Sequence, residues 1–555
     1  MKKTTPLLAA IGLSLAALSS ASLAGEKIWI SLGDAALAQL QKHSDSARPR
    51  LSVSSGLSRS GEFSAASSAR RPGLSSGAAR TAAAAQPESI HLVQIDEDLL
   101  GQLSESIHEE LRRCGGYMFH ASLEDGLATL QAHSAEGAKT RGALASGNET
   151  AAAGRAPLLS RPSYVIDQQA LVTPMLAQMQ ASRIGQTIVD LSSFTNRFYK
   201  TSSGVAASNW IKQQWANLGA GRNDFSVVQF NHPSWAQKSV IATIKGSDNS
   251  GEVIVLGAHM DSINGSNTTE TTVAPGADDD ASGVASLTEI LRTLMANNYK
   301  PRRTIQFMAY AAEEVGLRGS QEIAKSHKRL GANVVGVMQL DMTNYKGSPK
   351  DIYIYTDYTD AAQNQFLNNL IQTYQPELSI GTDVCGYGCS DHASWTAQGY
   401  PASLPFEAAF NQDNPKIHTA NDTYANTGSQ ADHSLKFARL GLSYAVELGS
   451  DGPGSSVPSD KVEVLKGRLA TGASQVLGPF KAKAGAFKAS TIGEGDIDLY
   501  VKAGAAPTTT SFDCKSDGST SVENCAINLS GNSEVYVLLK GYATGTYKLT
   551  VSYQP

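Results

Sequence analysis

Three apolar runs in the middle of the chain each lead into side chains that commonly bind metal ions. The runs cover residues 253–258, 304–310 and 334–340, and the side chains that follow them are His259, Glu313, Glu314 and Asp341. Charged groups directly after a buried strand are costly unless they are paired or bound to a cation. The pattern therefore predicts a metal site at the ends of three strands.

Three consecutive carboxylates, Asp278, Asp279 and Asp280, lie between the first two runs. At the start of a helix such residues also suit the positive end of the helix dipole, which is a purely structural explanation. Three adjacent negative charges repel one another, however, and a nearby cation relieves that repulsion. We expect one of these carboxylates to bridge two metal ions, with His418 supplying a second imidazole from a distant segment.

The types of donor narrow the choice of metal and of chemistry. Two imidazoles and three carboxylates suit zinc or a similar divalent ion and argue against calcium, which prefers oxygen ligands alone. Five donors with one bridging group fit two ions roughly 3.5–4 Å apart, as in two-metal hydrolytic enzymes. The adjacent side chains of Glu313 and Glu314 point different ways, so one can bind metal while the other acts as a general base. The His-Glu-x-x-His motif of many single-zinc proteases does not occur in the sequence.

The segments between the apolar runs carry helical patterns. Residues 282–295 repeat apolar side chains every three to four positions, and residues 317–330 do so over a shorter length. Strands that alternate with helices predict a mostly parallel, mixed sheet flanked by helices. Because ligands bind at the carboxyl ends of such strands, the donors are expected to converge in one crevice of an α/β domain over residues 164–450.

The N-terminal part of the sequence predicts export and processing. Lys2 and Lys3, followed by an apolar stretch and small residues, are typical of a signal peptide, which we expect to span residues 1–24. Residues 88–133 have the patterns of a small folded unit, flanked by stretches too poor in large apolar residues to order themselves. We therefore expect a propeptide over residues 25–163, although an extension without a role is an alternative. Its second linker offers accessible cleavage points at Arg141, Arg155 and Arg161.

The C-terminal part of the sequence predicts a separate all-β unit. A linker over residues 451–461 leads to residues 462–555, where short alternating runs between Gly- and Ser-rich turns predict a small β-sandwich. Export permits disulfides. Four of the five cysteines form two pairs that are close in sequence, and the fifth lies in the predicted propeptide: Cys385 and Cys389, Cys514 and Cys525, and Cys114. The Cys514–Cys525 pair would staple one loop of the β-sandwich.

The overall composition limits the expected partners. The chain has 555 residues, is 41% hydrophobic and carries a formal net charge of −5, so nothing indicates nucleic acid or an anionic membrane as a partner. No internal apolar run approaches the roughly 20 residues that a transmembrane anchor needs. His232, His327 and His433 belong to no constellation and are expected at the surface.

Long strings around the predicted donors resemble the secreted bacterial leucyl aminopeptidases, a family of two-zinc exopeptidases. The strings cover residues 274–283, 309–320, 339–345 and 385–392. The resemblance extends over about residues 165–450 and implies an α/β fold of the zinc exopeptidase type. Residues 495–500 and 545–547 are similar to the bacterial pre-peptidase C-terminal domain.

The resemblance implies two zinc ions and a role for each donor. It assigns His259 and Asp341 to one ion and Glu314 and His418 to the other, with Asp279 bridging both. Every position that this metal set needs is filled in the sequence, so nothing indicates an inactive homologue.

The resemblance also implies which residues act on the substrate. Glu313 would be the general base, Tyr387 would help to hold the oxyanion, and Asp261 would orient the first zinc-binding histidine. A disulfide between Cys385 and Cys389 would stand beside the substrate pocket. Apolar residues would line that pocket: Met342, Phe406, Phe410 and Ile417, with Tyr355 and Leu404 at further lining positions.

These features predict a secreted, zinc-dependent aminopeptidase that releases leucine-like, hydrophobic residues from peptides with a free N-terminus. The propeptide is expected to inhibit the enzyme or to assist its folding, and the enzyme is expected to be a monomer. One alternative is another exopeptidase or a glutaminyl cyclase on the same fold. A second, from a different class, is a non-catalytic binding protein that uses its C-terminal β-sandwich.

Overall fold

The computed structural model describes most of the chain in four stretches. These are residues 27–133 with gaps at 45–46, 55–88, 112 and 114; residue 162; residues 164–451 without 266; and residues 461–553. Several predicted features lie outside the described residues: the signal peptide, Cys114, most of the 451–461 linker, and the cleavage points Arg141, Arg155 and Arg161. Among the described helices, none is long and apolar enough to cross a membrane.

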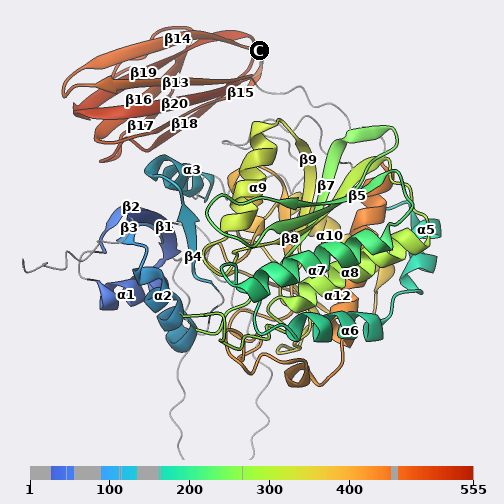
Figure 1. Ribbon diagram of the computed structural model, residues 1–555. Helices are drawn as coiled ribbons and strands as arrows, with labels where there is room; N and C mark the ends of the chain where they lie inside the picture. Colours follow the sequence, from blue (N-terminus) through green and yellow to red (C-terminus); the bar gives the residue numbers. More distant parts are fainter. Residues whose placement is uncertain are drawn as a thin grey trace, which may run out of the picture.

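An eight-stranded mixed sheet forms the centre of the molecule (Figure 1). In spatial order its strands are β11 (Ile380–Asp383), β10 (Ile352–Tyr355), β12 (Ala402–Phe406), β9 (Asn333–Gln339), β7 (Asn249–His259), β8 (Arg303–Tyr310), β6 (Ser239–Ile244) and β5 (Phe225–Phe230). β7 pairs in parallel with β8 and β9, and β9 pairs in parallel with β12. Towards the edges, β10 and β11 are parallel, whereas the pairs β5–β6, β6–β8 and β10–β12 are antiparallel. The predicted mixed sheet with a parallel centre is confirmed.

Helices cover both faces of this sheet because successive side chains of a strand point to opposite sides. Ile254 and Leu256 of β7 pack with residues of α6, α7, α8, α10 and α12, whereas Val255 packs with residues of α9 and α11. The helices of this part are α5 (Gln169–Leu176), α6 (Ala181–Ser192), α7 (Ser202–Leu218), α8 (Ala281–Ala296), α9 (Arg318–Arg329), α10 (Ala361–Tyr374), α11 (His392–Ala397), α12 (Asp432–Ser450) and the short 3-10 helix η2 (Tyr424–Thr427). α8 and α9 confirm the two helices predicted between the strands.

The N-terminal residues form a small unit of their own around an antiparallel sheet. Its strands, in spatial order, are β2 (Pro49–Ser54), β3 (Ser89–Asp96), β1 (Lys27–Gly33) and β4 (Tyr117–His120). Its helices are α1 (Asp34–His43), α2 (Leu99–Ser106) and α3 (Leu123–His133), and α2 continues directly into a π-helical turn, η1 (Ile107–Leu111). Ile30 of β1 packs against Leu40 of α1 and Leu103 of α2, which gives the unit its own core.

This N-terminal unit packs against the segment that follows β8. The backbone N–H of Phe119 donates to the carbonyl oxygen of Gly316 at 3.1 Å, and the guanidinium of Arg318 pairs with Glu97 at 2.8 Å. Leu317 is buried in one apolar cluster with residues of β3, β4 and α3. The unit is therefore seated beside the loop that carries two of the predicted site residues.

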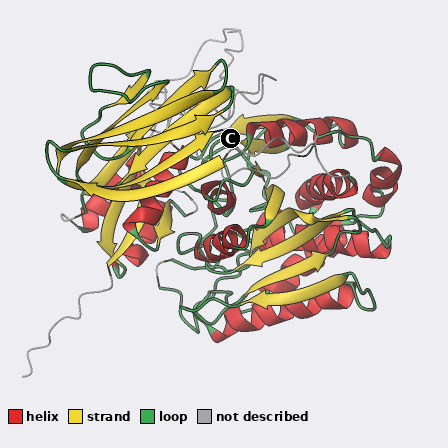
Figure 2. Ribbon diagram, turned by 90° about the horizontal axis from the view of Figure 1, so that it is seen from above, coloured by secondary structure: helices red, strands yellow, loops and turns green. Residues whose placement is uncertain are grey.

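The C-terminal residues form two stacked four-stranded sheets, drawn in red and orange in Figure 1 and seen apart from the central sheet in Figure 2. One sheet holds β13 (Lys461–Leu469), β20 (Gly545–Tyr553), β15 (Gly485–Ile492) and β18 (Glu523–Leu529); the other holds β14 (Ser474–Ala482), β19 (Ser533–Ala543), β16 (Asp496–Ala503) and β17 (Cys514–Ser516). Alternating side chains of both sheets, such as Phe487 and Val537, form a shared core. The Cys514–Cys525 disulfide joins β17 to β18 and therefore links the two sheets.

Candidate active site

Three predicted donors stand where neighbouring strands of the central sheet end. His259 is the last residue of β7, while Glu314 and Asp341 lie shortly after β8 and β9. These three strands are parallel, so their carboxyl ends lie at the same edge of the sheet. All three side chains are buried, which places charged and polar groups together in the interior of the molecule.

Asp279, just before α8, stands between two histidines. Its Oδ1 atom lies 3.0 Å from Nε2 of His259, and its Oδ2 atom lies 3.2 Å from Nε2 of His418. Asp341 Oδ1 is 3.5 Å from the same nitrogen of His259, and Glu314 Oε2 is 2.8 Å from that of His418. By these distances the donors fall into two groups that share Asp279: His259 with Asp341, and His418 with Glu314.

The charge of these donors fits bound cations. Oδ1 of Asp341 is buried and, among the described residues, makes no hydrogen bond. Burial lowers the pKa of His418, but the carboxylates of Glu314 and Asp279 outweigh this and raise it to about 10. Clustered buried carboxylates need positive charge beside them, which divalent cations supply, and the mixture of imidazole and carboxylate suits zinc.

Asp261 holds the two adjacent glutamates in place through their main chain. Its carboxylate oxygens accept the backbone N–H groups of Glu313 at 3.0 Å and Glu314 at 3.2 Å. Nδ1 of His259 lies 3.2 Å from the backbone carbonyl oxygen of Asp261 and 3.6 Å from its carboxylate. Asp261 is therefore placed to orient His259, and it also positions both glutamates, which the sequence did not indicate.

Glu313 lies beside the donors without belonging to either group. Its Oε2 atom is 4.0 Å from Nε2 of His259, and among the described residues its carboxylate oxygens make no hydrogen bond. Burial raises the pKa of Glu313 well above its usual range; His259 opposes the rise, while Asp391 and Asp341 add to it. A carboxylate of raised pKa next to metal donors is suited to take a proton from water.

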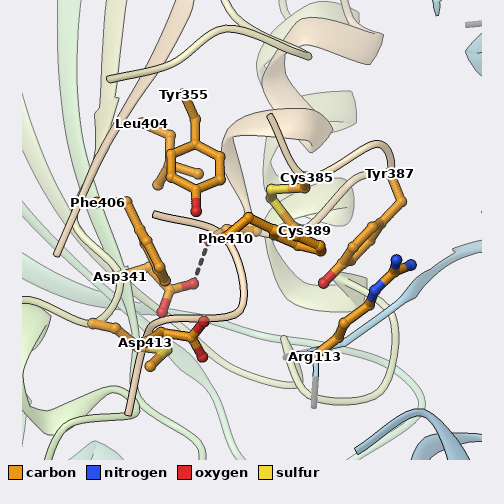
Figure 3. Close-up of a pocket in the computed structure, with 12 residues that line it drawn as sticks. Arg113, Asp341, Tyr355, Cys385, Tyr387, Cys389, Leu404, Phe406, Phe410 and Asp413 are labelled. Atoms are coloured by element: carbon orange, nitrogen blue, oxygen red, sulfur yellow. Dashed lines mark hydrogen bonds between the residues drawn. A yellow bond between two sulfur atoms is a disulfide. The ribbon is translucent and has the colours of Figure 1, made fainter. Parts of the chain in front are cut away.

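A pocket beside the donors has mostly apolar and aromatic walls (Figure 3). Met342, Phe406 and Phe410 line it as predicted, whereas Ile417 lies instead in the lining of a neighbouring cavity next to His418. Its walls also include Tyr355, Leu404, Tyr387 and the Cys385–Cys389 disulfide, together with the polar residues Ser390, Asp413 and Arg113. Asp341 also reaches this lining, so the pocket opens onto the metal donors.

Comparisons with known proteins agree with this arrangement. The model of peptidase family M28 matches residues 239–441. Leucine aminopeptidase 1 of Uncinocarpus reesii is 36% identical over 301 residues, which cover 52% of this chain and 74% of that protein. The chain belongs to peptidase family M28. Leucine aminopeptidase 1 of Phaeosphaeria nodorum is 37% identical over 289 residues, covering 50% of this M28 chain and 72% of that protein.

Solved structures share the fold of this chain. LapB from Legionella pneumophila superimposes with a TM-score of 0.56 at 29% identity, covering 77% of this chain and 100% of that chain. The LapA aminopeptidase of the same organism gives a TM-score of 0.56 at 25% identity, covering 77% of this chain and 99% of that chain. Both sequence relatives described above are fungal, so the resemblance is not confined to bacterial enzymes.

Sequence reasoning missed two carboxylates that support the M28 site. Asp280 accepts the backbone N–H groups of His259 at 3.0 Å and Met342 at 3.1 Å, which ties together the ends of β7 and β9. Asp422 accepts the N–H group of Asp279 at 3.1 Å. Asp280 belongs to the run of three carboxylates in the sequence, but the backbone groups that it binds are distant in sequence. Asp422 lies in no recognisable motif.

Two of the three histidines that were expected at the surface are buried instead. His232 and His433 are buried and His327 is half-buried. His232 lies within 2.7 Å of both Glu322 and Ser239, so it is a hydrogen-bonded interior residue. The expectation was wrong because a lone histidine gives no sequence signal of burial.

The N-terminal unit contributes to both cavities of the M28 site. Arg113 lines the side-chain pocket, and His108 lines the neighbouring cavity with His418. Neither residue stood out in the sequence, where the expected propeptide had no assigned contact residues.

Proposed function

We propose that this chain is a secreted, two-zinc aminopeptidase that removes leucine-like, hydrophobic residues from the N-termini of peptides. The observation that carries the proposal is the position of Asp279, whose two carboxylate oxygens each face a different histidine. A single carboxylate between two imidazoles, each with a further carboxylate beside it, is suited to two metal ions. The leucine aminopeptidases among its relatives support the choice of reaction.

The metal roles follow from the two groups of donors. His259 and Asp341 would hold one zinc ion, Glu314 and His418 the other, and Asp279 would bridge them. When bound, such ions polarise the scissile carbonyl and lower the pKa of a coordinated water to about 7.

The chain's own groups would then move protons and orient the peptide. Glu313 takes a proton from the attacking water and passes it to the leaving amine, because its carboxylate is buried beside the donors and has a raised pKa. The hydroxyl of Tyr387, in the wall of the pocket, would donate a hydrogen bond to the oxyanion. The aromatic and aliphatic pocket would hold the side chain of the first residue.

The parts outside the α/β domain belong to the same proposal. Residues 1–24 would direct export, and the two disulfides suit an oxidising compartment. Residues 25–163 would act as an inhibitory propeptide, which is supported by the contribution of Arg113 and His108 to the cavities of the site. The β-sandwich over residues 462–555 is proposed to be a pre-peptidase type of domain, and the enzyme is proposed to act as a monomer.

The test uses the secreted form, with its two ends determined by mass spectrometry and its metal content measured. We expect close to two zinc ions per chain, and hydrolysis of leucine p-nitroanilide that is lost on chelation and restored by zinc. Cyclisation of an N-terminal glutamine without peptidase activity would instead indicate a glutaminyl cyclase. Absence of both activities in a fully processed, metal-loaded protein would overturn the proposal.

A further inference from the structure

One segment of the N-terminal unit runs along the open side of the site. It begins at the end of α2, continues through η1 and reaches Arg113. Glu105, His108 and Glu109 form one wall of the cavity beside the donors, and residues from the loops around Asn264 and His418 form the other. The segment therefore stands where a substrate would approach the second group of donors.

His108 is the residue of this segment that stands beside a metal donor. The π-helical turn carries its ring to 5.0 Å from the ring of His418, measured between centroids, with 40° between the planes. Its Nδ1 atom is buried and, among the described residues, makes no hydrogen bond. An imidazole with an unused ring nitrogen next to a zinc-type donor set has the chemistry of a further ligand.

Arg113 lies at the side-chain pocket rather than at the cavity beside His418. Its guanidinium carbon lies 5.0 Å from the centre of the Phe410 ring and 5.8 Å from that of the Tyr387 ring. Figure 3 shows the guanidinium beside the Tyr387 ring, on the side of the pocket away from Tyr355. Cation–π attraction of this kind favours a cation over an aromatic ring, so Arg113 covers the aromatic wall of the pocket.

We propose that His108 is a metal ligand of the uncut chain, bound to the ion that Glu314 and His418 hold, and that Arg113 is a second point of attachment. This rests on the proposed two-zinc function and deepens it. Catalytic zinc sites keep one position open for water or substrate, whereas structural sites are closed by protein ligands. His108 would close that position, and removal of the N-terminal unit would open it.

The unit is held on the α/β domain by contacts that do not involve His108. Lys325 of α9 pairs with Asp125 at 2.6 Å, and Arg318 pairs with Glu97 at 2.8 Å. Phe119 adds a backbone hydrogen bond to Gly316. Replacing His108 should therefore leave the unit seated, which allows metal ligation to be tested separately from docking.

The experiment uses the full uncut chain, kept from cleaving itself by Glu313→Gln and loaded with Co²⁺ in place of zinc. The visible spectrum of Co²⁺ reports the number and type of its ligands. We expect His108→Ala and His108→Gln each to change this spectrum and to speed the loss of metal to a chelator by about tenfold or more, the effect of losing one supporting group at a metal site. The matched control is Gln41→Ala, because Gln41 is exposed on α1 of the same unit.

The outcomes separate this inference from the proposed function. Identical spectra and chelation rates for the parent chain and both His108 variants, with the N-terminal unit still protected from added protease, would overturn it. Failure of the mature, processed enzyme to bind metal would overturn the proposed function instead. Arg113→Ala is expected to leave the Co²⁺ spectrum unchanged but to raise the residual activity of an uncut chain that retains Glu313. A changed Co²⁺ spectrum in Arg113→Ala would contradict the proposal that His108 binds the metal while Arg113 only attaches the unit at the pocket.

Discussion

The metal donors and the side-chain pocket lie next to each other, yet they are built differently. The donors stand at the ends of parallel strands, and buried carboxylates such as Asp261 and Asp280 fix them by accepting main-chain N–H groups. The pocket is assembled from short strands and loops far apart in sequence, with Tyr355 from β10 and Phe406 from β12. A disulfide closes one of its walls.

This difference indicates how each half of the site responds to substitution. The donor half comprises the five metal donors and the carboxylates that support them, and the pocket half comprises the lining of the side-chain pocket. In the donor half, positions are set by main-chain hydrogen bonds and buried charge, so the loss of one group removes a step of the chemistry. In the pocket half, apolar contacts set the volume, so a substitution changes preference by degrees. The expected effects below therefore decrease from the donor half to the pocket and then to the outlying units.

The largest effect is expected for Glu313→Gln in the processed enzyme. Glutamine keeps the shape of the side chain but cannot accept a proton from water, and general acid–base catalysis contributes about 10²–10⁴-fold. We expect kcat for leucine p-nitroanilide to fall about a thousandfold while metal content stays unchanged. Glu377→Gln, at an exposed position, is the control. A kcat within a few-fold of the parent would remove Glu313 from the role of base.

The donor half could be predicted well because its signals are local. Four of the five donors lie close to the end of a strand or the start of a helix, as His259 does at the end of β7, whereas His418 lies in the loop between β12 and η2. Parallel strands bring their carboxyl ends to one edge, so sequence position alone implied proximity. What could not be predicted is the support of these donors, because Asp280 and Asp422 act through backbone groups that only the folded chain brings near.

The pocket half was predicted less completely for the same physical reason. Its members come from many segments, and the choice between neighbours depends on the direction of each side chain. Ile417 lines the neighbouring cavity together with His418, whereas Leu404 lines the pocket itself. The contribution of Arg113 had no sequence signal, because it depends on how a separate unit is seated.

A graded effect is expected for Leu404→Ala. Leu404 is buried in the pocket wall, and its truncation makes room for a larger substrate side chain. We expect the ratio of kcat/KM for phenylalanine over leucine p-nitroanilide to rise about tenfold, since small changes in an apolar pocket alter selection by 10–200-fold. Leu330→Ala is the matched control because Leu330 is 77% exposed. An equal loss on both substrates would mean that Leu404 supports the fold rather than the preference.

A stability effect that depends on pH is expected at Asp357, which anchors the disulfide loop of the pocket. It accepts the N–H groups of Cys385 at 3.2 Å and Gly386 at 2.7 Å. Burial outweighs these bonds and raises the pKa of Asp357 to about 6.

The sign of that effect follows from proton binding. Between about pH 4 and pH 6 the folded chain holds the Asp357 proton and the unfolded chain has released it, so stability falls as pH rises. The asparagine of Asp357→Asn does not titrate. The free energy of unfolding of the parent, relative to this variant, should therefore drop by roughly 2 kcal/mol from pH 4 to pH 6. Urea unfolding at several pH values measures it, and a constant difference would show that Asp357 is already ionised at pH 4.

The smallest effect on catalysis is expected from removing residues 462–555. The described β-sandwich lines neither cavity of the site. It contacts the N-terminal unit instead, where Lys548 pairs with Glu124 at 2.8 Å and Ile492 shares an apolar cluster with Leu127 of α3. Truncation should therefore leave kcat and KM of the processed enzyme within about twofold of the parent.

The same truncation should act weakly on the uncut chain. The side chain of Glu124 is 53% exposed, and exposed ion pairs contribute about 0–1 kcal/mol, so release of the N-terminal unit should quicken by only a few-fold. Glu124→Gln separates the ion pair from the apolar contact, and protease accessibility of residues 105–113 measures release. A tenfold loss of kcat in the truncated, processed enzyme would contradict the inference that the β-sandwich plays no part in catalysis. Unchanged release would show that the contacts with the α/β domain are sufficient to hold the N-terminal unit in place.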